Sequence, residues 1–169
     1  MEFTQLQATD NLIPVIELIN AAYRGTGGQN RWTTEAHLVA GQRLSLEGLK
    51  HLLLQDNVVL TVAHSERDLL GCITSTYLGK IVEFGAFAVQ PSRHDSGIGK
   101  QLLAHAESRA RPLCSMFQVE VVSQNHALIE FYSRRGYRST GERAPYPVEL
   151  NVGTPLDDEI DLVIMQKPA

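Results

Sequence analysis

The sequence predicts a mixed α/β (α+β) domain, in which a central sheet of about six to seven strands carries about four helices. Stretches with strand composition and stretches with helical spacing of apolar residues follow one another along the chain. Their order is β-α-α-β-β-β-α-β-α-β-β, which indicates a mixed sheet rather than a regularly alternating one. The chain has 169 residues, of which 43% are hydrophobic, and no repeat or linker divides it. We therefore expect residues 1–169 to form a single domain.

The N-terminal third predicts one strand and then helices. A strand pattern over residues 3–8 precedes a helix that Asp10 can cap. The apolar residues of this helix recur at helical spacing and are Ile13, Ile16, Ile19 and Tyr23. The glycine-rich segment 25–30 is typical of a loop, and two short helices are expected at 34–40 and 46–55.

The next block predicts neighbouring strands. Residues 58–64 and 69–78 are rich in strand-forming side chains, and the polar segment 65–68 between them predicts a hairpin. A third strand is expected at 81–89.

A helix is predicted over residues 97–111 and ends at Pro112. One face of this helix is apolar and consists of Ile98, Leu102 and Ala106. The alternation of apolar and polar residues over 117–121 then predicts a half-buried strand.

The C-terminal part predicts a helix and two strands. Asn125 can cap a helix that stops at Gly136, because glycine commonly terminates helices. Residues 137–143 and 160–165 supply the last strands.

The composition argues against several partners. A net charge of −4 and a pI near 5.8 argue against nucleic acid and mildly favour a cationic or neutral substrate. No run approaches the ~18 apolar residues of a membrane span, and residues 1–5 do not resemble a signal peptide, so no membrane partner is expected. Cys72 and Cys114 are too few for a disulfide framework, which suits the reducing cytoplasm.

The most informative stretch joins the strand at 81–89 to the helix at 97–111 through a loop ending in Gly97-Ile98-Gly99. Glycines let the backbone approach a ligand, and the first N–H groups of a helix can bind a pyrophosphate. An ordinary tight turn has the same pattern, so this motif alone leaves both interpretations open. The third glycine of a dinucleotide fingerprint and the Gly-Lys-Ser/Thr end of a P-loop are both missing.

Two motifs in the same order resemble those of one known family. The run Phe87-Ala88-Val89-Gln90-Pro91, followed by Gly97-Ile98-Gly99-Lys100, resembles the acyl-CoA loop of the GNAT acetyltransferases. Segment 125–137 resembles that family's Asn-x-x-Ala…Tyr-x-x-x-Gly-Phe/Tyr element. Together with the intervening helix and strand, the resemblance covers residues 81–137. It implies the GNAT acyl-CoA N-acyltransferase fold and an acetyl-CoA-dependent N-acetyltransferase.

One position departs from the family pattern. His94 stands where Arg or Gln is usual, and Asp95 stands where glycine is common. An acidic side chain near a pyrophosphate is unfavourable, although it can point outward or cap the helix, and Arg93 can restore positive charge. The departure concerns the affinity for the cofactor more than its identity.

The resemblance implies that acetyl-CoA is the cosubstrate, with its pantetheine arm along the strand and its pyrophosphate at the loop. The residues assigned to it are Phe87, Ala88, Val89, Arg93, His94, Asp95, Ser96, Gly97, Ile98, Gly99, Lys100 and Asn125. Residues 87–89 are equally typical of a central core strand, and Asn125 is also a helix cap.

The resemblance also implies the catalytic residues. Tyr132 matches the family's general acid, which protonates the leaving thiolate, and Glu83 matches a carboxylate that deprotonates the amine directly or through water. A packed tyrosine and a polar residue alternating out of a strand are the structural alternatives. His105 and His126 are expected on solvated helix faces, and no spaced set of ligands predicts a metal.

The acceptor is expected to contact segment 23–43. Residues 20–24, followed by Trp32-Thr33-x-Glu35, resemble a subgroup of the family. Trp32 offers a flat apolar wall and Glu35 can pair with a cationic amine, or Trp32 anchors this segment to the core. The acceptor would be a small-molecule or peptide amine, and a homodimer is left open.

The sequence therefore predicts an enzyme that moves an acetyl group from acetyl-CoA to a primary amine by direct attack, with no covalent enzyme intermediate. The alternative from another class is a non-catalytic acyl-CoA-binding or regulatory module, which His94 and Asp95 in the loop suggest.

Overall fold

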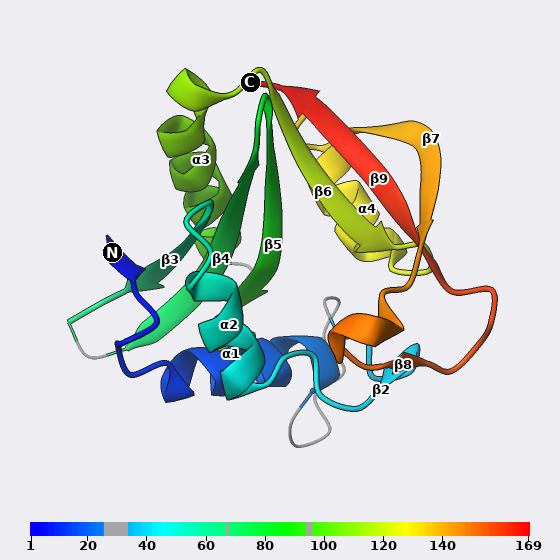
Figure 1. The fold of residues 1–169 in the computed structure, drawn as a ribbon, viewed down its shortest axis with the longest axis horizontal. Helices are drawn as coiled ribbons and strands as arrows, with labels where there is room; N and C mark the ends of the chain where they lie inside the picture. Colours follow the sequence, from blue (N-terminus) through cyan, green and yellow to red (C-terminus); the bar gives the residue numbers. More distant parts are fainter. Residues whose placement is uncertain (26–33, 67, 94–95) are drawn as a thin grey trace.

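The fold is a mixed α/β arrangement built around a seven-stranded sheet, as expected (Figure 1). It is a computed structural model, which describes residues 1–25, 34–66, 68–93 and 96–169. The strands of the main sheet are β1 (Glu2–Leu6), β3 (Val58–His64), β4 (Leu69–Leu78), β5 (Ile81–Val89), β6 (Met116–Val122), β7 (Arg138–Pro145) and β9 (Asp161–Pro168). Their spatial order is β1-β3-β4-β5-β6-β9-β7. Only β5 and β6 run parallel among these paired strands.

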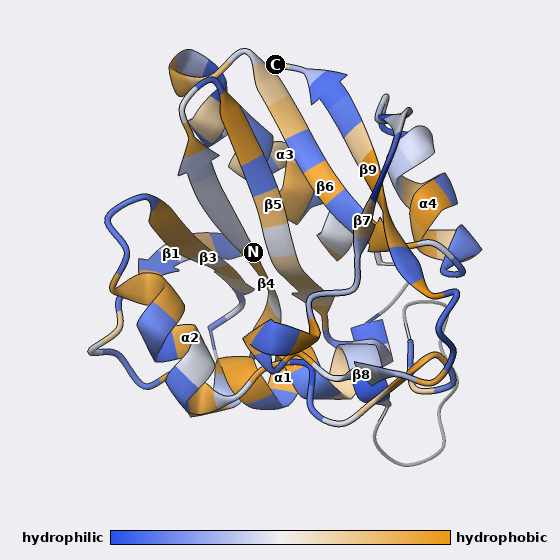
Figure 2. Cartoon of the chain, turned by 45° about the vertical axis from the view of Figure 1, so that its right-hand side comes forward, coloured by the Kyte–Doolittle hydropathy of each residue, from blue (hydrophilic) through white to orange (hydrophobic). Residues whose placement is uncertain are grey.

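The α-helices cover both faces of the sheet. They are α1 (Ile13–Arg24), α2 (Leu46–Leu53), α3 (Ile98–Ala110) and α4 (His126–Ser133). Helices α3 and α4 share one hydrophobic core with the sheet, and α1 and α2 share another on the opposite face. The hydrophobic residues concentrate on the central strands and these helices, whereas β7 is mostly hydrophilic (Figure 2).

Segment 34–40 does not form the helix that its sequence predicts. It makes a turn and the short strand β2 (Val39–Ala40), which pairs with β8 (Thr154–Pro155). Leu38 and Val39 are buried in a small core with Tyr146. Contacts with the distant C-terminal segment therefore override the local helical preference.

Helix α1 differs from its prediction at its N-terminus. Its N-cap is Leu12, and Asp10 instead accepts a hydrogen bond from Gln7 N at 2.7 Å. Ile13 is 53% exposed, whereas Ile16, Ile19 and Tyr23 pack on the core as expected. The buried residues of the helix are Val15, Leu18, Ile19 and Ala22.

A bulge interrupts β5 near its C-terminal end. Cys72 pairs with Ala88 and Thr74 pairs with Gly85, so one residue of β4 lies opposite two residues of β5. Ala86, inside the bulge, has a φ of +43°, which the side chains of L-residues disfavour.

The bulge changes the face to which β5 directs its buried residues. Val82 and Phe84 lie in the core beneath α3 and α4, whereas Ala86 and Ala88 lie in the core beneath α1 and α2. Even-numbered residues are thus buried along the whole strand, but on opposite faces of the sheet before and after the bulge.

Strands β5 and β6 separate beyond the middle of the sheet. Their parallel pairing starts at Ile81 and Met116 and reaches only Phe84 and Val119. The two strands then diverge, β5 toward α1 and β6 toward α4 (Figure 1). No helix of the described residues is both long and apolar enough to cross a membrane.

Candidate active site

Two cavities lie at the opening between β5 and β6. The α3–α4 cavity has a volume of about 410 Å³ and is lined by the C-terminal end of β5, the start of α3, one side of α4 and the end of α1. The α1–α2 cavity has a volume of about 530 Å³ and is lined by α1, α2, β4, β5, β6, part of α4 and the segment after β7. Tyr23, Phe87 and Leu128 line both cavities. The cavities therefore adjoin at the opening.

The start of α3 offers backbone donors to the α3–α4 cavity. Gly97 is the N-cap, with a left-handed φ of +77°. The N–H of Gln101 donates to Gly97 O at 3.1 Å, so the amides of residues 98–100 precede the first intrahelical hydrogen bond. Because the positive end of the helix dipole lies here as well, this turn can bind an anion.

Gly99 has a packing role in addition to any contact with a ligand. A Cβ at this position would lie 3.4 Å from Phe87 Cζ and 3.4 Å from Val89 Cγ2. The absence of a side chain therefore lets α3 approach β5 closely, which explains the second glycine of the loop without a ligand.

Positive charges surround the α3–α4 cavity. Its lining includes Arg93, Lys100, Arg134 and Arg135 and one carboxylate, Glu130. Glu130 forms an exposed ion pair with Arg134, at 3.6 Å. The excess of cations suits a ligand that carries several phosphate groups.

Arg135 is a lining residue that the sequence motifs did not identify. Its Cζ lies 3.4 Å from the centroid of the Phe131 ring, and its Nη1 donates to Phe131 O at 2.6 Å. Its Nε is buried and has no hydrogen-bond partner among the described residues. The pair of arginines before Gly136 was the available sequence signal.

Tyr132 lies where the two cavities adjoin. Its ring packs against Phe131 and Phe87, and the residue lines the α1–α2 cavity. Its hydroxyl makes no hydrogen bond to a described residue. Burial, and secondarily the nearby Tyr23 phenol, raise the pKa of Tyr132 well above its usual value, so the group stays protonated.

Tyr23 is a second tyrosine of this site, which the motifs did not single out. It lines both cavities from the last turn of α1. Burial raises the pKa of Tyr23 to about 12, although the positive charge of Arg43 opposes the shift. The Arg43 guanidinium lies over the Tyr23 ring, with Cζ 5.0 Å from its centroid.

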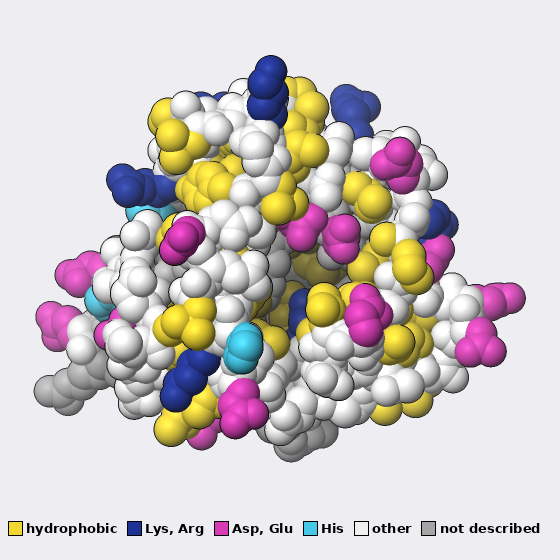
Figure 3. Space-filling model, in the orientation of Figure 1, with side chains coloured by type: hydrophobic (Ala, Val, Ile, Leu, Met, Phe, Trp, Pro, Cys, Tyr) yellow, Lys and Arg dark blue, Asp and Glu magenta, His cyan; other side chains and the backbone are white. Residues whose placement is uncertain are grey.

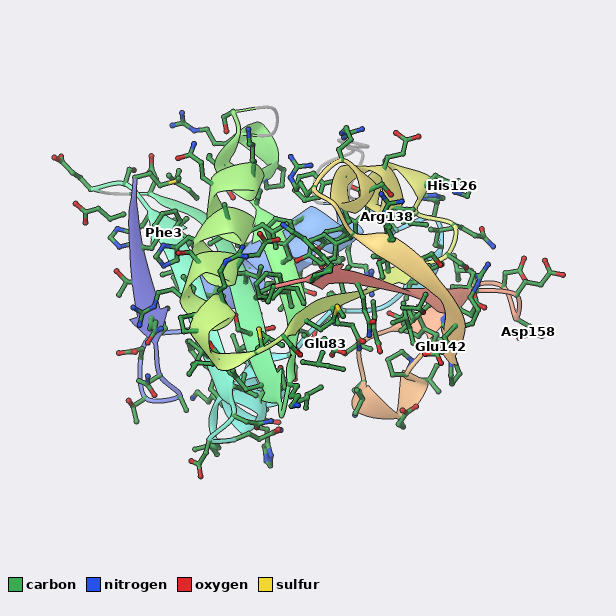
Figure 4. The ribbon with its side chains drawn as sticks, turned by 90° about the horizontal axis from the view of Figure 1, so that it is seen from above. Phe3, Glu83, His126, Arg138, Glu142 and Asp158 are labelled. Carbon is green, nitrogen blue, oxygen red and sulfur yellow. The ribbon has the colours of Figure 1, made fainter. Side chains whose placement is uncertain are left out.

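Glu83 lines the α1–α2 cavity in the paired part of β5. Gln118 Nε2 donates to Glu83 Oε2 at 2.9 Å, and Gln166 Nε2 donates to Gln118 Oε1 at 2.7 Å, so the carboxylate is held in place. Glu83 lies near the middle of the molecule, far from His126, which is exposed at its edge (Figure 4).

Glu120 adds a second carboxylate to the wall of this cavity. It follows Gln118 by two positions on β6, so the two side chains share a face of the sheet. Partial burial, and secondarily the charge of Glu83, raise the pKa of Glu120. The sequence motifs did not identify this residue.

Glu35 and Asn125 form a buried network. Asn125 Nδ2 donates to Glu35 Oε1 at 3.2 Å, and Asn125 Oδ1 accepts from Leu128 N, which confirms Asn125 as the cap of α4. Glu35 Oε2 lies 3.6 Å from Arg24 Nη1. Burial raises the pKa of Glu35, and the Asn125 hydrogen bond opposes the shift. Both oxygens of Glu35 therefore already have partners.

The structure brings most of the expected cofactor residues together. Those that line the α3–α4 cavity are Phe87, Ala88, Val89, Arg93, Gly97, Ile98, Gly99 and Lys100. Ser96 lies beside this group, and its hydroxyl donates to Arg93 O. Trp32, His94 and Asp95 lie outside the described residues.

The described cysteines are not arranged as nucleophiles. The buried Cys72 Sγ donates to Ala86 O, at 3.4 Å, and burial raises the pKa of its thiol to about 12. Burial also raises the pKa of Cys114. A thiol that stays protonated is a poor nucleophile. Within the described residues, no group of three or more His, Cys, Asp or Glu side chains is placed to hold a metal ion.

Comparison with known families gives one match. The model of the family described as "Acetyltransferase (GNAT) family" matches residues 17–137, a span that contains the start of α3 and all of α4. No curated protein gives a significant sequence match.

Solved structures share the fold over nearly the whole chain. A protein from Streptococcus mutans UA159, smu.2055, superposes with a TM-score of 0.74 at 20% identity, covering 99% of each chain. A GNAT family acetyltransferase from Elizabethkingia anophelis with acetyl-CoA bound has a TM-score of 0.73 at 16% identity, covering 99% of this chain and 97% of that one. The PaiA N-acetyltransferase from Thermoplasma acidophilum in complex with coenzyme A has a TM-score of 0.69 at 20% identity, covering 99% and 98%.

Proposed function

The chain belongs to the acetyltransferase (GNAT) family, whose members are acyl-CoA N-acyltransferases, and on this premise we propose that it transfers an acetyl group from acetyl-CoA to a primary amine by direct attack. One observation carries the proposal. Two cavities adjoin where β5 and β6 separate, so a thioester and an amine can meet there. We also propose that residues 1–169 act as one domain, because β1 and β9 bring both ends of the chain into one sheet.

Acetyl-CoA would occupy the α3–α4 cavity. The amides of residues 98–100 and the cations around the cavity would bind its phosphates, and the pantetheine arm would lie along residues 87–89. In the structure from Elizabethkingia anophelis, acetyl-CoA is the bound molecule, which supports the acetyl group as the one transferred here. We place Ser96 at the edge of this site; His94 and Asp95 lie outside the described residues and remain candidates from the sequence alone.

The acceptor amine would enter through the α1–α2 cavity. Glu83 would take a proton from the ammonium group, directly or through water, and the neutral nitrogen would attack the thioester carbonyl carbon. A backbone N–H on the edge of β5 that no longer pairs with β6 would stabilise the oxyanion. The C–N bond then forms and the C–S bond breaks, without an acylated cysteine.

Tyr132 would stabilise the departing sulfur. Its hydroxyl stays protonated and can donate to the thiolate as the C–S bond breaks. The same burial that raises the phenol's pKa would also raise that of a thiolate formed beside it, so the proton can pass to sulfur. Coenzyme A would then leave as the thiol.

A thiol-release assay tests this proposal. The protein is incubated with acetyl-CoA and a mixture of amines, amino acids and short peptides, and the release of free coenzyme A is followed together with the mass of the acetylated product. We expect release that depends on an amine. Tight binding of acetyl-CoA without release on any amine would instead identify a binding or regulatory module.

A further inference from the structure

The acceptor cavity contains one arginine that forms no close ion pair with a described carboxylate, although its charge favours the ionised form of Glu35 and so opposes the rise that burial causes in the pKa of that group. Arg43 is the only Lys or Arg among the described residues that line the α1–α2 cavity. It belongs to none of the ion pairs between described residues. The nearby carboxylate of Glu35 is engaged by Asn125 and Arg24. A half-buried guanidinium without a carboxylate is unusual, because charges removed from water are normally paired.

The position of Arg43 is fixed from two sides. Its backbone N–H donates to Asn20 Oδ1 at 2.7 Å, and Asn20 Nδ2 donates to Leu44 O at 2.9 Å. These bonds hold the segment that carries Arg43 against α1. The guanidinium itself lies over the Tyr23 ring, and Tyr23 borders both cavities. The cation is therefore preorganised close to the place where the acetyl group would arrive.

Carboxylates line the same cavity. They are Glu35, Glu83, Glu120 and Glu149. Figure 3 shows the hollow in the middle of this face, with acidic side chains at its rim and a Lys or Arg side chain inside it. The cavity thus presents to a ligand one arginine without a close ion pair, together with several carboxylates.

We propose that the acceptor is an amino-acid-type molecule, which carries a carboxylate that Arg43 binds and an amine that the Glu83 side of the cavity receives. The guanidinium can hold a carboxylate through two parallel hydrogen bonds, which also fixes the orientation of the amine. A diamine would place a second positive charge near Arg43 and would be disfavoured. This inference rests on the proposed acetyl transfer and adds the substrate class.

Matched acceptors test the inference. The panel contains the common α-amino acids, β-alanine and 4-aminobutyrate. For each amino acid that is acetylated, its carboxamide and its decarboxylated amine are tested as well. Putrescine and spermidine represent acceptors with more than one amine. We expect kcat/KM for the free amino acid to exceed that for its carboxamide by about 10- to 100-fold, the usual effect of a charged pair.

Variants assign this preference to Arg43. In R43Q the preference for the free carboxylate should fall to within about 3-fold, while the KM for acetyl-CoA stays unchanged. R43K keeps the positive charge and should therefore retain part of the preference for the free carboxylate. This variant tests the inference even if R43Q folds poorly. K50Q removes an exposed cation of α2 that does not line the cavity, and it should retain the full preference.

The outcomes separate the two proposals. Equal use of the carboxamide or the decarboxylated amine, or a diamine as the best acceptor, would overturn the inference and leave acetyl transfer standing. A carboxylate preference that persists in R43Q would also overturn it. No transfer to any amine, despite bound acetyl-CoA, would overturn the proposed function and the inference together.

Discussion

The side-chain amide of Asn125 donates a hydrogen bond to the carboxylate of Glu35 across 90 positions of the chain, and both residues are buried. This bond joins the segment after α1 to the N-terminus of α4. Glu35 lines the α1–α2 cavity, where the sequence suggested a contact with the acceptor. Because its carboxylate also joins these two segments, its substitution should affect folding first.

Glu35→Gln should lower the free energy of unfolding by about 2 to 4 kcal/mol, because it leaves the buried Arg24 without a compensating charge. The KM values for acetyl-CoA and for the acceptor should stay close to those of the parent at a temperature where both are folded. Denaturant unfolding and steady-state kinetics measure the two effects. If the KM for the acceptor rose while stability stayed unchanged, Glu35 would instead contact the acceptor.

Gly97→Val should weaken acetyl-CoA binding by at least about 10-fold in calorimetry, because a branched side chain strains a left-handed backbone that presents the amides of α3. Gly141→Val is the matched control. Gly141 also has a positive φ, +85°, and a Cβ there would meet nothing within 4 Å. Gly141→Val should lower stability but keep the parent's affinity for acetyl-CoA. If Gly97→Val also bound acetyl-CoA as tightly as the parent, the anion site would be refuted.

Tyr132→Phe should lower kcat on the order of 100-fold and leave acetyl-CoA binding intact, because in the proposed reaction the phenol acts only as the thiolate leaves. Tyr137→Phe serves as the control. The Tyr137 hydroxyl donates to Glu107 at 3.0 Å, so its loss should reduce stability by about 1 to 2 kcal/mol without a comparable loss of kcat. If chemistry limits turnover and kcat is unchanged in Tyr132→Phe, Tyr132 has no catalytic role.

The alkaline limb of the pH profile should reflect the raised pKa of Tyr132. The phenol is active while protonated, and it loses its proton only above its pKa, which burial and Tyr23 raise. Because the usual tyrosine pKa is about 10, activity that depends on the Tyr132 proton should be lost only above pH ~10. Measured between about pH 7 and 10, kcat should therefore not decline. A decline centred near pH 9 that Tyr132→Phe abolishes would contradict this assignment.

Local patterns predicted much of the fold. The strands at 58–64, 69–78 and 81–89 have the expected bounds, because their composition and the turns between them are local properties. Segment 34–40 was predicted wrongly as a helix, since its pairing with β8 depends on residues far along the chain. The bulge at Ala86 left no sequence signal, because burial alternates through it without interruption.

The candidate site was only partly visible in the sequence. Gly97 and Tyr132 belong to contiguous motifs, so they could be selected by their spacing, and both now border cavities. Tyr23, Arg43 and Glu120 come from separate elements and carry no motif, and only the folded chain brings them to one cavity. Their chemistry depends on distance and burial, which spacing along the sequence does not encode.

The separation of β5 and β6 has a consequence for the order of events. Because the two cavities are distinct and share only three of the described residues in their linings, each ligand of the proposed reaction would have its own route to solvent. Neither ligand would then have to depart before the other arrives, and the complex could assemble in either sequence. Only the acetyl group would cross from one cavity to the other, while the coenzyme and the acceptor would each remain in the cavity that they entered.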